Sequence, residues 1–143
     1  MPTDRPPGHR LPNPFADLIA LAIDEQRSGY SRLSLQLAPE HMNLHGVAHG
    51  AVVFAMADTG MGTALYPTLD KGQICATIEI KVNYFKPVLR GRLVCVTELL
   101  NRGKRVANLD SRVYLDDQLV AQANGNYAIF SPSDAARRAA GHA

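Results

Sequence analysis

The segment GAVVFAMADTGMGTALYP constrains the fold more than any other part of the sequence. Its apolar residues recur at i, i+3, i+4 and i+7 until Pro67, which predicts one helix over residues 50–65. Its small residues include Ala51, Ala55, Ala57, Gly60, Gly62 and Ala64. Each interior glycine costs about 1 kcal/mol in helix propensity, but small residues allow other backbone to approach closely. We therefore expect the rest of the chain to enclose this helix.

Strands are predicted after this helix. Over residues 74–84, apolar side chains at the even positions alternate with polar ones such as Thr77 at the odd positions, which predicts a strand with one apolar face. Further strands are expected at 92–101, 104–116 and 118–130. The short connections NRGK and DDQ between these three strands predict antiparallel hairpins.

Two shorter elements are predicted before the helix. Residues 14–26 have helical apolar spacing, with Asn13 as a possible N-cap and Gly29 as a stop. Over residues 33–37, leucines alternate with polar residues, which predicts a strand. The order of elements predicts an α+β fold in which a curved antiparallel sheet surrounds one central helix.

Length and composition favour one soluble globular domain, since the chain has 143 residues, of which 46% are hydrophobic and 20% charged. We assign the domain to residues 15–130, between disordered tails at 1–14 and 131–143. No apolar run is long enough to span a membrane and the N-terminal residues lack a signal-peptide core, so we expect a cytoplasmic protein. Cys75 and Cys95 lie in apolar runs, which favours buried reduced thiols.

The formal net charge of +2 is unevenly distributed along the chain. Each tail contributes one positive charge and residues 15–130 are neutral overall. Within them, residues 81–112 contain eight Lys or Arg against two Asp or Glu. No interleaved aromatic residues or known binding motif accompany this charge, so nucleic acid is not an expected partner.

Three histidines four residues apart, His41, His45 and His49, would share one face of a helix and could then bind a metal ion. Pro39 and Gly46 disfavour a continuous helix there, and no HExxH motif is present. We therefore expect no metal site.

The triplet Asp58-Thr59-Gly60 matches the tripeptide of aspartic proteases. That motif belongs on a tight turn between strands, whereas here it falls in the middle of a predicted helix. A GxSxG nucleophile motif and the phosphate-loop motifs are absent from the sequence. These hydrolase and nucleotide-binding classes are therefore disfavoured.

Asp58 could be an ordinary polar residue on an exposed helix face. In an enclosed helix, however, a carboxylate is costly unless it has partners or a chemical role. Gly50, at the start of the helix, offers free N–H groups and the positive end of the helix dipole to an oxyanion. The two residues are eight positions apart, about 12 Å along one helix, so a shared substrate would require two chains related by a two-fold axis.

At these residues the chain resembles the hot-dog-fold acyl-CoA thioesterases, in particular the phenylacetate-degradation-type (PaaI-like) branch. The resemblance rests on Asn43, the pair His49-Gly50, Asp58 fifteen residues after Asn43, and the strand CATIEIKVNYFKPVLRG. It covers nearly the whole predicted domain. One departure is Ala51, because the family commonly has HGG.

The resemblance implies a role for each matching residue. Asp58 would be the general base or the nucleophile for thioester hydrolysis, and the Gly50 N–H would form the oxyanion hole. Asn43 would lie near the thioester or its water, and His49 would assist on the leaving-sulfur side. Thr77 would help to hold the catalytic water, although it could equally be an ordinary strand residue.

An acyl-CoA substrate also requires cations for the phosphates of coenzyme A. Arg90, Lys104 and Arg105 are candidates, and solvated strand charges are the alternative. No cofactor is expected, because coenzyme A is itself part of the substrate.

The expected assembly is a homodimer that forms the active site, and a homotetramer as a dimer of such dimers. The acyl group is expected to be aryl or of medium chain length. Two other functions remain open: a hot-dog enoyl-CoA or acyl-ACP dehydratase, and a module that only binds acyl-CoA.

Overall fold

The computed structural model describes residues 13–133 and residue 141. The predictions of disorder for residues 1–12 and for most of 131–143 lie outside the described residues. The α-helices and strands are, in order, α1 (Pro14–Leu18), β1 (Ala22–Arg27), β2 (Tyr30–Gln36), α2 (Gly50–Leu65), β3 (Ile74–Tyr84), β4 (Arg92–Arg102), β5 (Val106–Leu115) and β6 (Gln118–Phe130), and two short 3-10 helices lie at Pro39–His41 and Tyr66–Thr68. No helix in this part of the chain is long and apolar enough to cross a membrane.

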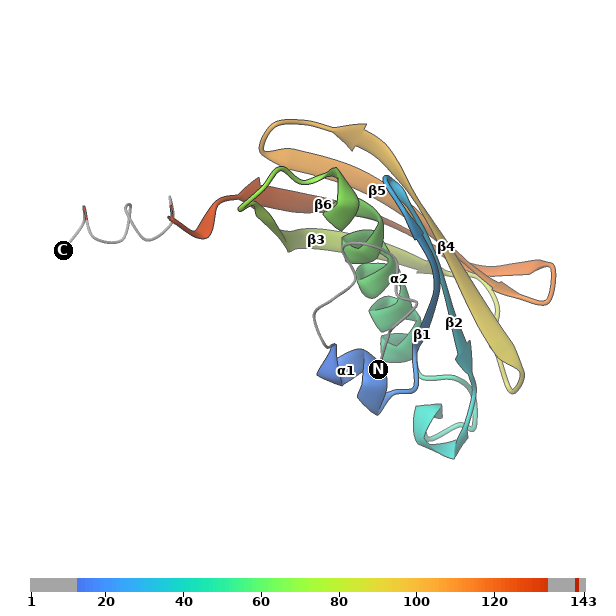
Figure 1. The fold of residues 1–143 in the computed structure, drawn as a ribbon. Coiled ribbons are helices and arrows are strands. Elements are labelled where there is room, and N and C mark those ends of the chain that lie inside the picture. Colours follow the sequence, from blue (N-terminus) through green and yellow to red (C-terminus); the bar gives the residue numbers. More distant parts are fainter. Residues whose placement is uncertain (1–12, 134–140, 142–143) are drawn as a thin grey trace.

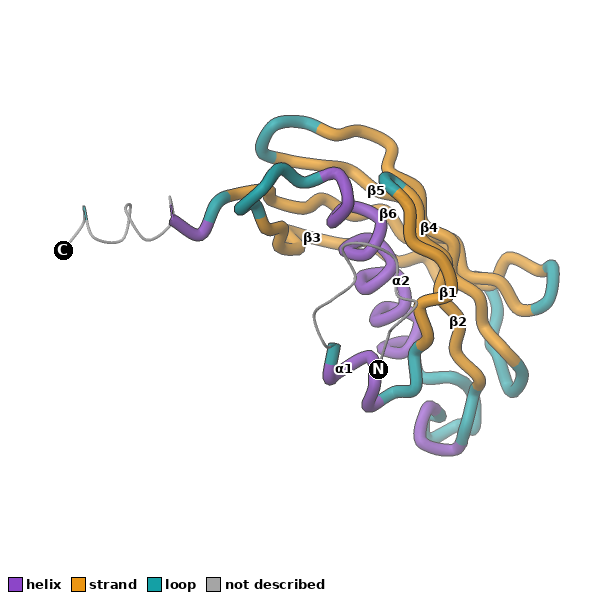
Figure 2. Tube along the Cα trace, viewed as in Figure 1, coloured by secondary structure: helices purple, strands orange, loops and turns teal. Residues whose placement is uncertain are grey.

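The six strands form one antiparallel sheet in the order β1-β2-β4-β5-β6-β3. The sheet curves, and α2 lies against its concave face (Figures 1 and 2). This confirms the predicted α+β hot-dog architecture and the two antiparallel hairpins β4–β5 and β5–β6. β3 pairs with β6, which places β3 at one edge of the sheet.

Gly60 has the predicted effect on packing, whereas Gly62 does not, since a Cβ atom there would meet nothing within 4 Å. A Cβ atom on Gly60 would lie 2.5 Å from Oγ1 of Thr97, so only glycine allows the helix to approach β4 this closely. Buried hydroxyls bond the helix backbone here: Ser31 Oγ donates to Gly60 O at 2.7 Å and Ser111 Oγ donates to Ala57 O at 3.2 Å. These bonds hold the middle of α2 on the sheet.

The predicted helix over residues 14–26 is wrong in its second half. Asn13 caps α1 as expected, but the helix ends at Leu18, and the backbone turns at Ala20, which has φ +57°. The chain then forms β1, because pairing with β2 at the sheet edge provides ladder hydrogen bonds that outweigh local helical spacing. Gly29, expected to stop the helix, instead lies between β1 and β2 at φ +78°.

The single alternation predicted for residues 74–84 is also wrong, because a register shift occurs between Thr77 and Glu79. Before the shift, the odd-numbered Thr77 points to α2, while Ile74 and Ile78 are 36% and 56% exposed. After it, the even-numbered Ile80 packs on the core. The shift therefore turns Thr77 inward and leaves apolar side chains on the outside of an edge strand.

Both cysteines are free thiols. Cys95 is fully buried, as predicted, and burial raises the pKa of its thiol to about 12. Cys75 is only partly buried, so the prediction of two buried thiols is correct for Cys95 alone.

Candidate active site

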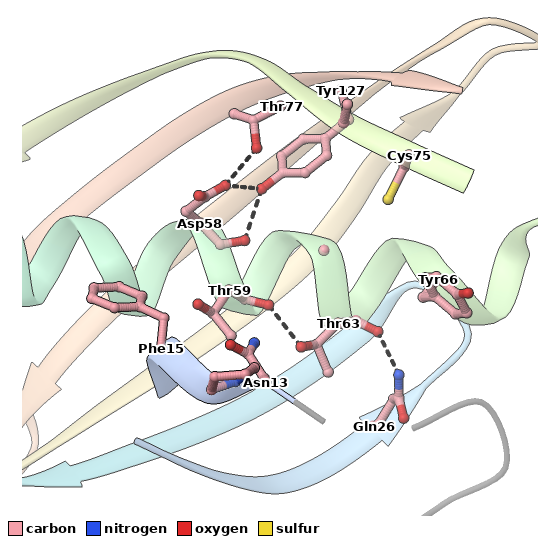
Figure 3. Close-up of a pocket in the computed structure, with 13 residues that line it drawn as sticks. Asn13, Phe15, Gln26, Asp58, Thr59, Thr63, Tyr66, Cys75, Thr77 and Tyr127 are labelled. Carbon is pink, nitrogen blue, oxygen red and sulfur yellow. Dashed lines mark hydrogen bonds between the residues drawn. The ribbon is translucent and has the colours of Figure 1, made fainter. Parts of the chain in front are cut away.

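Asp58, in the middle of α2, points toward β3 and β6 (Figure 3). Its Oδ1 accepts hydrogen bonds from Thr77 Oγ1, at 2.7 Å, and from the Tyr127 hydroxyl. Its Oδ2 has no hydrogen-bond partner among the described residues and is not buried. One oxygen is therefore held by two donors while the other is free to accept a proton or to attack a substrate.

Tyr127 was not found by sequence reasoning. It lies in β6 opposite Thr77 and is 3% exposed. Its hydroxyl oxygen also lies 2.7 Å from the main-chain oxygen of Asp58. Burial and the hydrogen bond to Asp58 raise the pKa of Tyr127 well above its usual value. The Tyr127 hydroxyl therefore stays protonated, and able to donate, at neutral pH.

If the chain hydrolyses acyl-CoA, as the resemblance implies, we expect Tyr127→Phe to lower kcat about ten- to hundredfold, because it removes one of two donors to the Asp58 carboxyl group. KM should change little, since the ring remains in place. The measurement is steady-state kinetics beside a thermal unfolding midpoint. Tyr114→Phe, on β5 and outside this pocket, is the matched control. An unchanged kcat in the Tyr127 variant would contradict the positioning role.

Asp58 lines a pocket of about 460 Å³ between α2, the first residues of β3 and the start of α1. The other lining residues are Asn13, Pro14, Phe15, Gln26, Thr59, Gly62, Thr63, Tyr66, Cys75, Ala76, Thr77 and Tyr127. Burial, and then the charge of Asp58, raise the pKa of the Cys75 thiol. Cys75 is therefore a poor nucleophile, which leaves Asp58 as the candidate reactive group of this pocket.

The first turn of α2 forms a second polar feature. The Gly50 N–H donates to no described residue. His49 caps the helix, with Nδ1 accepting from Ala51 N at 2.9 Å, so a neutral His49 ring carries its proton on Nε2. The hydroxyl of Tyr84 donates to Gly50 O at 2.8 Å, on the other side of the turn. An unpaired backbone donor is thus held at the positive end of a 16-residue helix.

Asn43 organises the loop before α2. Its Oδ1 accepts from His45 N at 2.8 Å and from Val47 N at 3.3 Å, which leaves its amide nitrogen available. The structure therefore brings Thr77 to Asp58 but keeps Asn43 with His49 and Gly50 in the region where α2 begins. Neither His49 nor Gly50 lines the Asp58 pocket.

The three histidines do not converge on a common point. His41 is buried at 2% exposure; its Nδ1 accepts from Ala38 N at 2.9 Å and its Nε2 donates to Ile19 O at 2.7 Å. His45 is exposed on the loop, and His49 caps α2. Across residues 13–133 and 141, no group of three or more His, Cys, Asp or Glu side chains is placed to hold a metal ion.

The candidate cations lie in two places. Arg90 follows β3, in a connection whose Val88 O accepts from Ala48 N just before α2. Lys104 and Arg105 lie in the turn after β4, whereas Arg90 lies just before the opposite end of β4. All three are exposed, and none forms an ion pair with another described residue. A single chain therefore does not gather them into one site.

Comparisons with known proteins identify the family of the chain. A model of the thioesterase superfamily matches residues 45–122. A Saccharolobus solfataricus protein, SSO1253, whose name provisionally assigns it to the esterases, is 30% identical over 115 residues, which are 80% of this chain and 76% of the relative. The medium/long-chain acyl-CoA thioesterase YigI of Salmonella typhimurium is 21% identical over 81% of this chain and 85% of its own.

The fold is also similar to that of a solved phenylacetic acid degradation protein, PaaI from Thermus thermophilus. The TM-score is 0.76 at 24% identity, and the match covers 81% of this chain and 98% of the other. At this identity the match supports the fold alone.

Proposed function

This chain belongs to the thioesterase superfamily, and from that premise we propose that it hydrolyses an acyl-CoA to a carboxylate and coenzyme A. The observation that carries the proposal is the Asp58 carboxylate, with one oxygen held by Thr77 and Tyr127 and the other open to the pocket. The activity named for YigI supports acyl-CoA as the substrate class. The acyl group that we propose is aryl or of medium chain length.

In this mechanism the free Oδ2 of Asp58 takes a proton from a water molecule, and the water attacks the thioester carbonyl. Collapse of the tetrahedral intermediate breaks the C–S bond and releases the coenzyme A thiolate. Alternatively, Oδ2 attacks the carbonyl itself, the C–S bond breaks to release the coenzyme A thiolate, and water hydrolyses the resulting mixed anhydride. Both routes use the oxygen that Thr77 and Tyr127 leave free.

We propose that the Gly50 N–H of a second chain stabilises the oxyanion. It is an unpaired donor at a helix N-terminus, which suits a developing negative charge. Within one chain it begins the helix that carries Asp58 about 12 Å further along. In a two-fold dimer with antiparallel α2 helices, each Gly50 can face the partner subunit's carboxylate.

The edge strand β3 supports such a homodimer. It is 11 residues long, its outer edge pairs with no described strand, and Ile74 and Ile78 expose apolar surface beside the Asp58 pocket. A second β3 paired around a two-fold axis would continue the sheet, place apolar side chains of the two strands next to each other on its outer face, and bring the two α2 helices together. A homotetramer built from two such dimers remains part of the proposal.

The remaining roles follow from the same arrangement. His49 presents Nε2–H, the donor that a leaving thiolate requires, and Asn43 keeps its amide nitrogen for the thioester or its water. Antiparallel pairing of two chains would bring Arg90 of one toward Lys104 and Arg105 of the other. These three cations are our candidates for the phosphates of coenzyme A.

The test is steady-state release of coenzyme A thiol from a panel of aryl and medium-chain acyl-CoAs, before and after exhaustive chelation. We expect release from at least one ester, and equal rates after chelation. Hydration of an enoyl-CoA without thiol release would favour the dehydratase. Tight binding with no turnover on the whole panel would favour the binding module.

A further inference from the structure

A second cavity lies beside the start of α2 and takes no part in the proposed chemistry. It has a volume of about 270 Å³, and residues of α1, of the loop before α2 and of the first two turns of α2 line it. We call it the apolar pocket, because most of its lining side chains are apolar. They include Ile19, Met42, Val52 and Ala55, while Glu40 and His49 are polar.

Phe15 is the one described residue that lines both the Asp58 pocket and the apolar pocket. Its ring extends from α1 toward α2, on the side of Thr59 that leads to the start of the helix (Figure 3). Along α2, the apolar pocket ends at Ala55 and the Asp58 pocket begins at Asp58, about 4.5 Å further along the axis. Phe15 is 56% exposed, so the core does not enclose its ring. The ring therefore stands between two cavities that follow one another along the helix.

The backbone that carries Phe15 is held at several points. Asn13 Oδ1 accepts from Ala16 N at 3.1 Å, and Ala16 itself is 3% exposed. At the other end of α1, His41 Nε2 donates to Ile19 O at 2.7 Å. The position of α1 therefore depends on these contacts, and the Phe15 ring can be shortened without opening the core.

We infer that Phe15 limits the length of the acyl group: the alkyl chain of an ester whose thioester lies at Asp58 runs along α2 and ends against the Phe15 ring. This rests on the proposed thioesterase function. The other end of the Asp58 pocket is lined by Gln26 and Thr63, polar side chains for which an alkyl chain offers no partner. Toward Phe15, the wall beyond the ring is mostly apolar. Without the ring the two cavities join, and a longer chain can bury its last methylenes there.

The test measures kcat/KM for saturated acyl-CoAs from butanoyl to tetradecanoyl in the wild type and in Phe15→Ala. In the wild type we expect kcat/KM to rise up to a medium chain length and then to level off. In Phe15→Ala the rise should continue to longer chains. The value for dodecanoyl-CoA should increase by about tenfold, as two newly buried methylenes predict at about fourfold each, and that for butanoyl-CoA should not change.

Leu18→Ala is the matched control, since Leu18 also lies on α1, is 79% exposed and lines neither cavity. It should keep the wild-type dependence on chain length. Ala55→Val, added to Phe15→Ala, tests where the extra methylenes lie, because Ala55 lines only the apolar pocket and valine adds two methyl carbons to its wall. The double variant should lose most of the gain with dodecanoyl-CoA and keep its activity on butanoyl-CoA. Thermal midpoints show that each variant is folded.

Three results would overturn the inference while leaving thioesterase activity established: a wild-type chain-length profile in Phe15→Ala, a change by one common factor for every ester, or a gain that survives Ala55→Val. Hydrolysis of no ester in this series or in the aryl panel would instead refute the proposed function. In that case calorimetric titration with intact butanoyl-CoA and dodecanoyl-CoA decides the matter. Tighter binding of dodecanoyl-CoA alone by Phe15→Ala supports the limit set by Phe15, and affinities equal to those of the wild type overturn it.

Discussion

Asp58→Asn is expected to lower kcat/KM for acyl-CoA hydrolysis by about 10²- to 10⁴-fold, the range associated with loss of a positioned general base. Asparagine has nearly the size of aspartate, and its side-chain oxygen can still accept from Thr77 and Tyr127. The pocket should therefore keep its shape and bind the ester. What is lost is the second oxygen, which in the variant is an amide nitrogen that can neither take a proton nor attack a carbonyl.

Initial rates of thiol release measure this effect, and calorimetric titration with the ester verifies that the variant still binds. Asp117→Asn, in the exposed turn between β5 and β6, is the matched control and should hydrolyse at the wild-type rate. A thermal midpoint close to that of the wild type excludes misfolding. If Asp58→Asn hydrolyses as fast as the control, Asp58 is not the catalytic carboxylate.

Local pattern predicted the helix α2 and the strands that follow it. The spacing of small and apolar residues in α2, and the turn residues between β4, β5 and β6, act over a few positions, so one sequence is enough to identify them. β1 could not be found this way. Its residues continue the helical spacing of α1, and only pairing with β2 at the sheet edge makes them a strand.

The active-site candidates also fall into two groups, those that local sequence suggested and those that only long-range contacts bring to the site. Asp58 and Gly50 were suggested by their places on one helix, a local feature. Tyr127 comes to Asp58 from 69 residues away. Contacts of this kind depend on strand order and register, and the register shift in β3 moves Thr77 to the face opposite to the one that alternation alone would give.

Gly50→Pro should reduce kcat by about 10²- to 10³-fold, the usual cost of losing one oxyanion-hole donor. Proline has no N–H, and it is well tolerated at the first position of a helix, where Gly50 lies. His49 is already extended, with φ −61° and ψ +136°, as a residue before proline must be. The substitution therefore deletes the donor with little change to the helix.

Gly50→Ala provides the control for this variant. Its Cβ would lie 3.2 Å from the Tyr84 hydroxyl, a crowding that proline shares, but alanine keeps the N–H. We expect Gly50→Ala to retain most of the activity. Equal losses in both variants would show that crowding against Tyr84, and not the missing donor, is responsible.

Pairing a chain that carries Gly50→Pro with a chain that carries Asp58→Asn tests whether each active site is shared between two chains. A heterodimer of the two single variants, isolated through a different tag on each chain, contains one site with both defects and one site with neither, if Gly50 acts on the partner's substrate. We expect it to recover about half of the wild-type activity, although each variant alone is nearly inactive. If Gly50 and Asp58 of the same chain served one substrate, every site in the heterodimer would carry one defect and no activity would return. Recovery therefore distinguishes a site built by two chains from one that is complete in a single chain.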